Sequence, residues 1–155
     1  MSKIVFICHG NICRSPMAEY VFRDLAEKRG VSVRFPAASR ATSTEELGNP
    51  VHRGTAQKLA EHGISAAAHR ARQLQKDDYE KYDLLICMDG ANVRNTLRIV
   101  GADKKGKVHK LLEYAGESGD IADPWYTGNF DETYEDVLRG CAELLDALCG
   151  ESMKK

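Results

Sequence analysis

The sequence lacks an excess of charge, a long apolar run and a block of like charges. Its formal net charge is -1 over 155 residues, so no basic field indicates a nucleic-acid partner. No stretch reaches the roughly 20 consecutive apolar residues that cross a bilayer, and the N-terminus lacks the cleavage pattern of a signal peptide. We therefore expect a cytoplasmic protein that binds neither nucleic acid nor membrane.

Paired cysteines are also missing. The chain has five cysteines, an odd number at irregular spacing, and no export signal precedes them. Such cysteines are typical of reduced intracellular thiols rather than of a disulfide framework. No C-x-x-C pair is present, so we expect no zinc site and predict a protein without metal or cofactor.

The chain does contain a regular alternation of apolar strands and amphipathic helices. The pattern predicts strands at 3–8, 31–38, 83–88 and 108–112, and helices at 17–29, 51–62, 75–82, 92–100 and 131–148. Polar loops are expected at 39–50 and 116–129. This order predicts an α/β fold, a three-layer sandwich with a central four-stranded parallel sheet. With no linker or repeat, we expect a single domain at 1–155 whose ligand lies at the carboxyl ends of the strands.

The segment from Cys8 to Pro16 joins the first predicted strand to the first predicted helix. The first N–H groups of a helix have no internal partners and its dipole favours negative charge, so this turn is suited to hold an anion. Gly10 permits the tight backbone turn that such a loop needs. Ser15 is expected to cap the helix. The position predicts a phosphate-binding loop at the carboxyl end of strand one.

Two side chains in this loop are suited to chemistry on a phosphate. A cysteine thiolate at a helix N-terminus is a strong nucleophile, which favours Cys8. The planar fork of Arg14 matches two phosphate oxygens. Ser15 is placed to hydrogen-bond the Cys8 thiolate and to help a phosphocysteine break down. The alternative is a buried strand-end cysteine and a surface arginine, because a bare C-x5-R spacing is a weak signal.

Phosphoryl transfer also needs an acid that protonates the leaving oxygen. Asp123 is the best candidate, since Pro124 stiffens its turn and Trp125 and Tyr126 offer aromatic walls beside it. Taken alone, an Asp-Pro pair is more often a plain turn.

Together these residues resemble the low-molecular-weight protein tyrosine phosphatases. The resemblance covers essentially the whole chain, and its most specific part is the pairing of the N-terminal loop with the Asp-Pro motif near the C-terminus. The matching stretches are Cys8–Pro16, Thr42–Pro50, His69–Gln73, Cys87–Asp89 and Asp123–Tyr126.

The resemblance implies hydrolysis of phosphotyrosine through a covalent phosphocysteine. Cys8 would be the nucleophile, Arg14 the phosphate clamp, and Asp123 the general acid and then the base that activates water. The partners would be phosphotyrosine proteins or peptides, with inorganic phosphate or another oxyanion in the loop. The protein would be a monomer or self-associate weakly.

The resemblance also assigns supporting residues. A hydrogen-bond network beneath the loop would be formed by Asn11, Ser15, Ser39 and His69. Cys13 matches the family's second loop cysteine, which would form a reversible disulfide with Cys8 and shield it from over-oxidation. Without the resemblance, His69 and Ser39 would be ordinary buried polar residues and Cys13 a small apolar one. The rest of the phosphate-binding loop is His9, Gly10 and Ile12.

The expected substrate rim departs from the family pattern. Glu45 stands where many relatives have an aromatic residue, so it would repel acidic peptides and remove a wall for the phosphotyrosine ring. Trp125, where many relatives have tyrosine, would supply that wall together with Tyr126. His9 replaces a residue that is more often apolar and would lie at the mouth.

Three other functions are compatible with parts of this pattern. Protein arginine phosphatases share the scaffold but have threonine where Ile12 stands, so Ile12 favours phosphotyrosine. Thiol-linked arsenate reductases need two further relay cysteines, and only Cys87 is near the right region. A non-catalytic phosphate-binding module would usually lack the nucleophile or the acid, whereas Cys8 and Asp123 are both present.

Overall fold

The computed structural model describes residues 1–154, and the side chains of residues 1–150. A four-stranded, fully parallel sheet has the order β2-β1-β3-β4. Its strands are β1 (Ile4–Cys8), β2 (Ala37–Ala41), β3 (Leu84–Cys87) and β4 (Val108–Lys110). The prediction of a four-stranded parallel sheet is therefore confirmed.

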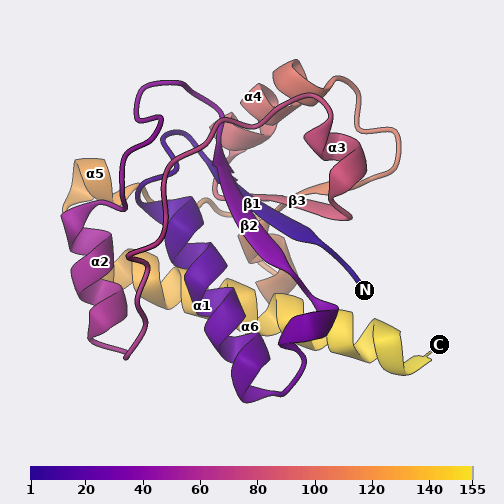
Figure 1. Ribbon diagram of the computed structural model, residues 1–155. Coiled ribbons are helices and arrows are strands. Elements are labelled where there is room, and N and C mark those ends of the chain that lie inside the picture. The colour runs from indigo at the N-terminus through magenta and orange to yellow at the C-terminus, as the bar shows by residue number, and fades with distance from the viewer. Residues whose placement is uncertain (155) are drawn as a thin grey trace.

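Helices cover both faces of this sheet (Figure 1). The α-helices are α1 (Arg14–Lys28), α2 (Arg53–Ala60), α3 (Asp78–Lys81), α4 (Gly90–Val100), α5 (Pro124–Thr127) and α6 (Phe130–Lys154), with 3-10 turns η1 (Ser32–Arg34) and η2 (Leu111–Ala115). Within residues 1–154, no helix is long and apolar enough to cross a membrane.

The side chains of β1 divide the core in two. Ile4 and Phe6 pack with α1 and α6 on one face, and Val5 and Ile7 pack with α3 and α4 on the other. All four are fully buried, as expected for a central strand whose alternate residues face opposite layers. The buried apolar surface on both faces explains the three-layer arrangement.

The position of β1 also decides where a ligand can bind. The chain passes from β1 through α1 to β2 on one side, and then crosses back to β3 on the other side of β1. In an open parallel sheet, this reversal leaves a crevice at the carboxyl ends of the strands. Cys8 is the last residue of β1, so it lies at that crevice.

Two local predictions were wrong. The strand expected at 31–38 is β2 at Ala37–Ala41, preceded by the 3-10 turn η1. The alternation of Val31, Val33 and Phe35 imitates a strand, but Val33 is 81% exposed and only Phe35 is buried among them. The alanines of β2 form a weak strand pattern, and their pairing with β1 decides the structure.

The first helix starts earlier than its sequence pattern indicates. It begins at Arg14 rather than Met17, and its N-cap, Cys13, makes no side-chain cap hydrogen bond. Ser15 is therefore the second helical residue and not the cap, because its hydroxyl faces the turn of the loop instead. Smaller differences are that the loop at 116–129 contains α5, and that the last helix, α6, runs over Phe130–Lys154.

Candidate active site

The phosphate loop, residues 8–15, curls around the sulfur of Cys8. Asn11 has a φ of 59°, a left-handed conformation that asparagine tolerates better than most residues. This turn directs the Asn11 N–H toward Cys8 Sγ at 3.3 Å. The Ser15 hydroxyl lies 3.0 Å from the same sulfur. The Cys8 sulfur thus has two polar groups beside it, although the residue is only 3% exposed.

The side chain of Asn11 holds the loop in this shape. Its amide Nδ2 donates to Ser15 Oγ at 2.8 Å, and its Oδ1 accepts from the Arg72 N–H at 3.0 Å. Its backbone carbonyl lies 2.7 Å from His69 Nε2. A carbonyl only accepts, so His69 carries the proton on Nε2. Burial lowers the pKa of His69, which favours this neutral form.

The hydroxyl of Ser39 makes its hydrogen bond to α1. Within the described side chains, its hydroxyl donates to Glu19 Oε1 on α1 at 2.6 Å, not to the phosphate loop. Glu19 in turn pairs with Arg23 at 2.6 Å. Ser39 therefore supports α1 from β2, and His69 is the closer support of the loop.

Arg14 is held by three partners from two parts of the chain. Its Nη1 donates to Asp89 Oδ2 at 2.6 Å and to the Ile121 carbonyl at 2.9 Å, and its Nη2 lies 3.5 Å from Asp123 Oδ2. Burial lowers the pKa of Arg14, but the negative charges at Cys8, Asp89 and Asp123 outweigh it and raise that pKa. The guanidinium therefore stays charged while only 3% exposed.

Asp89 is a site residue that the sequence analysis did not single out. One oxygen of its carboxylate accepts from Arg14, and the other caps α4 by accepting from the Asn92 N–H at 2.8 Å. Asp89 lies two residues after the end of β3, the strand next to β1, which places it at the carboxyl edge of the sheet, but no local pattern indicates its contact with Arg14. Its carboxylate fixes the direction of the guanidinium.

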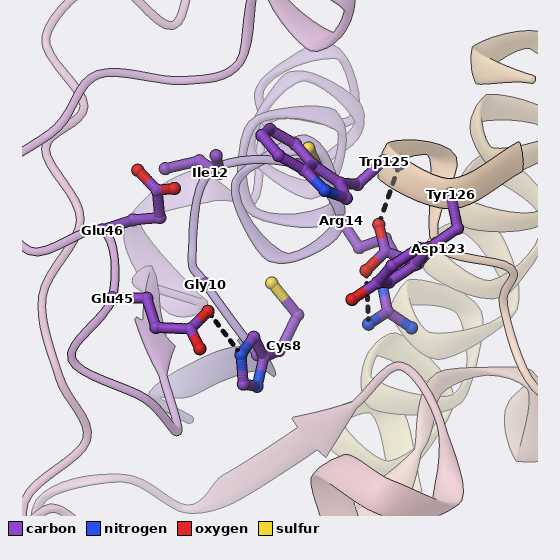
Figure 2. Close-up of a pocket in the computed structure, with 11 residues that line it drawn as sticks. Cys8, Gly10, Ile12, Arg14, Glu45, Glu46, Asp123, Trp125 and Tyr126 are labelled. Atoms are coloured by element: carbon purple, nitrogen blue, oxygen red, sulfur yellow. Dashed lines mark hydrogen bonds and ion pairs between the residues drawn. The ribbon is translucent and has the colours of Figure 1, made fainter. Parts of the chain in front are cut away.

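Asp123 lies across the pocket from the loop and begins α5. Its Oδ1 accepts from the Trp125 N–H at 3.0 Å, which leaves Oδ2 near Arg14. The carboxylate is 24% exposed, so it can reach both a bound group and water. Figure 2 shows Cys8, Arg14 and Asp123 around one pocket.

The rim of the pocket has two unlike walls (Figure 2). Glu45 and Glu46 form an acidic wall on one side, and Trp125 and Tyr126 form an aromatic wall on the other. His9 Nε2 lies 2.8 Å from Glu45 Oε2, so the phosphate loop is tied to the acidic wall. Both aromatic side chains are largely exposed, with Trp125 at 57% and Tyr126 at 83%.

Glu46 is a second rim residue that the sequence analysis missed. Its Oε2 accepts from Asn49 Nδ2 at 2.6 Å, and its Cγ would lie 3.5 Å from a Cβ added at Gly10. The carboxylate chain thus packs close to the phosphate loop. No distinctive spacing marks Glu46 apart from its neighbour Glu45.

The remaining loop residues also line the pocket. Ile12 contributes an aliphatic side chain, and Cys13 is 5% exposed on the same lining as Cys8. Burial, followed by the negative charge at Cys8, raises the pKa of Cys13 to about 12. Cys13 is therefore a protonated thiol at neutral pH. Among the described residues, no group of three or more His, Cys, Asp or Glu could hold a metal ion.

Comparisons with known proteins agree with this geometry. The family model of the low molecular weight phosphotyrosine protein phosphatases matches residues 3–155. The chain is 39% identical over 150 residues to the low molecular weight protein-tyrosine-phosphatase YfkJ of Bacillus subtilis, covering 96% of both chains. The crystal structure of YfkJ superposes with a TM-score of 0.94 over 97% of this chain and 96% of that one.

Two further solved structures are similar over nearly the whole chain. SP-PTP, a low molecular weight protein tyrosine phosphatase from Streptococcus pyogenes, is 37% identical with a TM-score of 0.86, covering 96% of this chain and 93% of that one. DARP, an arginine phosphatase from Drosophila, is 25% identical with a TM-score of 0.85, covering 96% and 98%. The same scaffold therefore occurs in proteins named for two different phosphorylated residues.

Proposed function

The chain belongs to the low molecular weight phosphotyrosine protein phosphatase family and is a protein-tyrosine phosphatase, and from this premise we propose how its residues divide the reaction. Cys8 is the nucleophile, Arg14 the phosphate clamp and Asp123 the general acid and base. The observation that carries the assignment is that all three line one pocket, with the Asn11 N–H and the Ser15 hydroxyl at 3.3 and 3.0 Å from Cys8 Sγ.

In the first step the sulfur of Cys8 attacks phosphorus, forming an S–P bond while the P–O bond to tyrosine breaks. The leaving phenolate oxygen takes a proton from Asp123. The buried guanidinium of Arg14 and the loop N–H groups stabilise the charge on the three remaining phosphate oxygens. Asp89 holds the guanidinium in place during this transfer, which its 2.6 Å hydrogen bond supports.

In the second step water replaces the sulfur. The oxygen of the water attacks phosphorus while the ionised Asp123 accepts a proton from that water. The S–P bond then breaks and inorganic phosphate is released. Cys8 leaves as a thiolate, which the nearby Ser15 hydroxyl stabilises by donating a hydrogen bond. The serine is held for this role by Asn11 Nδ2.

Phosphotyrosine is favoured over phosphoarginine by the chemistry of the pocket walls. Ile12 and Trp125 offer apolar surface against which a phenyl ring packs well. Arsenate reduction is disfavoured by Cys87, which is fully buried beside Thr96, with a pKa that burial raises to about 12. Such a thiol is poorly suited to a redox relay.

We also propose that Cys13 protects Cys8 during oxidation. A peroxide would convert the Cys8 thiolate to a sulfenic acid, and the Cys13 sulfur would displace water from it to form a disulfide. The high pKa of Cys13 opposes this attack, but part of the rise comes from the negative charge at Cys8, which sulfenic acid formation removes. A dithiol reductant would restore both thiols.

The setting of the enzyme belongs to the same proposal. Five free cysteines suit a reducing compartment, which supports the cytoplasm. Residues 1–155 act as a single domain and as a monomer or weak self-associate, because the three reacting side chains come from one chain. Phosphotyrosine proteins or peptides are the substrates, and inorganic phosphate or another oxyanion occupies the loop as product or inhibitor.

The test is hydrolysis of a phosphotyrosine peptide and a phosphoarginine peptide of the same sequence, by the unaltered protein and by Asp123→Ala. Fast phosphotyrosine turnover that falls by roughly 10²–10⁴-fold in the variant would support the proposal. A preference for phosphoarginine would overturn the substrate assignment. Unchanged turnover in Asp123→Ala would overturn the acid assignment.

A further inference from the structure

His52 connects the loop that carries the nucleophile to the loop that carries the acid. Its backbone N–H donates to the Ile12 carbonyl of the phosphate loop at 2.8 Å. Its ring meets the ring of Trp125 edge-on, with the two centroids 5.4 Å apart. His52 therefore contacts both sides of the pocket without lining it.

The ring of His52 is fixed from three directions. It caps α2, because its Nδ1 accepts from the Gly54 N–H at 3.0 Å. It stacks on Phe130 with an interplanar angle of 19° and a centroid distance of 5.3 Å. Phe130 reaches this position only because residue 54 is glycine, since a Cβ there would lie 2.3 Å from the phenyl ring. These two contacts and the edge-on contact with Trp125 together restrain the imidazole ring from three sides.

The contact with Trp125 extends to the acid through the backbone. Trp125 is the residue whose N–H donates to Asp123 Oδ1 at 3.0 Å (Figure 2). Because this donor is the backbone N–H of Trp125, a displacement of the Trp125 backbone would release the Asp123 carboxylate from its orientation, and the ring contact with His52 restrains Trp125. On the other side, the Thr55 hydroxyl of the same helix start contacts the Cys13 carbonyl at 3.4 Å.

We infer that His52 is a positioning residue for the general acid, in an inference that rests on the proposed function. Through Trp125 it holds Asp123 at a fixed place relative to the phosphate loop, to which its own backbone is bonded. Proton transfer requires that the acid lie within hydrogen-bond reach of the leaving oxygen, and a small misplacement is costly. His52 thus acts on leaving-group protonation rather than on phosphate binding.

Two small substrates separate these roles. Phenyl phosphate releases phenolate, which is as basic as the tyrosine side chain and needs the acid. The p-nitrophenolate released from p-nitrophenyl phosphate is far less basic and depends less on protonation. The quantity to measure is the ratio of kcat/KM for phenyl phosphate to kcat/KM for p-nitrophenyl phosphate. This ratio is independent of the fraction of folded enzyme, so a partly unfolded variant still gives a valid answer.

We expect Asp123→Asn to lower the ratio by roughly 10-fold or more, and His52→Ala to lower it by roughly 3- to 10-fold. In the Asp123→Asn background, His52→Ala should change the ratio by less than about 2-fold, because the acid through which it acts is gone. His52→Phe, which keeps an aromatic ring, should retain most of the ratio. His52→Asn keeps a capping acceptor without the ring and should behave like His52→Ala.

His62→Ala is the matched control. His62 lies just after the other end of α2 and stacks on Tyr134 of α6, with centroids 4.1 Å apart, and it does not line the pocket. Its loss should leave the ratio unchanged.

An unchanged ratio in His52→Ala would overturn the inference, as would an additive loss in the double variant or an equal loss in His62→Ala. An unchanged ratio in Asp123→Asn would instead overturn the acid assignment itself.

Discussion

The floor and the rim of the pocket are built in opposite ways. The floor is one continuous stretch, residues 8–15, in which Asn11 and Ser15 are fully buried and Arg14 is 3% exposed. The rim comes from two segments far apart in the chain, and its side chains are exposed except for the half-buried Glu46, with Glu45 at 69% and Tyr126 at 83%. The floor is thus organised before a substrate arrives, and the rim remains open to it.

This difference indicates that the floor carries out catalysis and that the rim discriminates among substrates. A buried, hydrogen-bonded floor loses little freedom in the transition state, which favours catalysis by fixed dipoles and charges. An exposed rim contributes weaker and salt-sensitive interactions, which suit discrimination among peptides. Changes in the floor should therefore cost large factors in turnover, and changes in the rim should alter preference by small factors.

The largest effect is expected from Cys8→Ser. A hydroxyl is a far weaker nucleophile than a thiolate, so turnover of phosphotyrosine should fall on the order of 10⁴-fold or more. The oxyanion pocket remains, so binding of inorganic phosphate, measured by calorimetry, should persist. Turnover near that of the unaltered protein would contradict a covalent mechanism at Cys8.

Arg14→Lys should follow, with a loss of roughly 10²–10³-fold in kcat for phosphotyrosine. Lysine keeps a positive charge but not the planar fork that contacts Asp89 and Ile121 while facing the phosphate. Arg72→Lys is the matched control, because Arg72 contacts the loop through its backbone N–H and not through its guanidinium. Steady-state kinetics of both variants measure the two losses in kcat. Equal losses in Arg14→Lys and Arg72→Lys would contradict a special role for the Arg14 guanidinium.

Asn11→Ala tests the floor through stability rather than rate. The substitution removes the amide that contacts Ser15 and Arg72, and it places alanine at a φ of 59°. The free energy of unfolding should therefore fall by about 2–4 kcal/mol. Asn95→Ala, which removes one exposed hydrogen bond from Arg98, should stay within about 0.5 kcal/mol. Urea unfolding of both variants measures the difference, and similar values would show that the floor is not specially organised.

The rim should show the smallest effect, as a change in charge preference. Two carboxylates beside a dianionic phosphate site disfavour acidic peptides, and Glu45→Gln with Glu46→Gln removes both charges. We expect the ratio of kcat/KM for a lysine-flanked peptide over a glutamate-flanked one to fall by roughly 3- to 10-fold, and less at high salt. Glu27→Gln, an exposed glutamate on α1 outside the pocket, should leave that ratio unchanged. A large loss for both peptides would instead place Glu45 or Glu46 in the chemistry.

Much of the floor could be predicted because its residues are contiguous. The strand before Cys8 and the helix after Arg14 are visible as apolar patterns, and together they indicate an anion site at the turn. The prediction that Ser15 caps the helix was wrong, because its hydroxyl accepts a hydrogen bond from Asn11 in the floor. A cap and a loop support look alike in sequence, because both are serines at a helix start.

The residues that act across the fold could not be read from the sequence. Asp89, Glu46 and His52 each reach the site through partners 36 or more positions away, and no local pattern encodes such a contact. The second strand was misplaced for a related reason, since the apolar Val33 points to solvent while the alanines of β2 pair with β1. The site residues and the position of β2 are both determined by contacts between segments far apart in the chain.

The most direct test of a floor built for covalent chemistry is to trap the intermediate. The unaltered protein would be mixed with a phosphotyrosine peptide, quenched within one turnover in alkaline denaturant, where an S–P bond survives, and measured by intact-protein mass spectrometry, followed by mapping of the modified residue. We expect one added phosphoryl group, located on Cys8 and absent from Cys8→Ser. A phosphoryl group on another residue, or rapid turnover with no covalent adduct at any time, would contradict it.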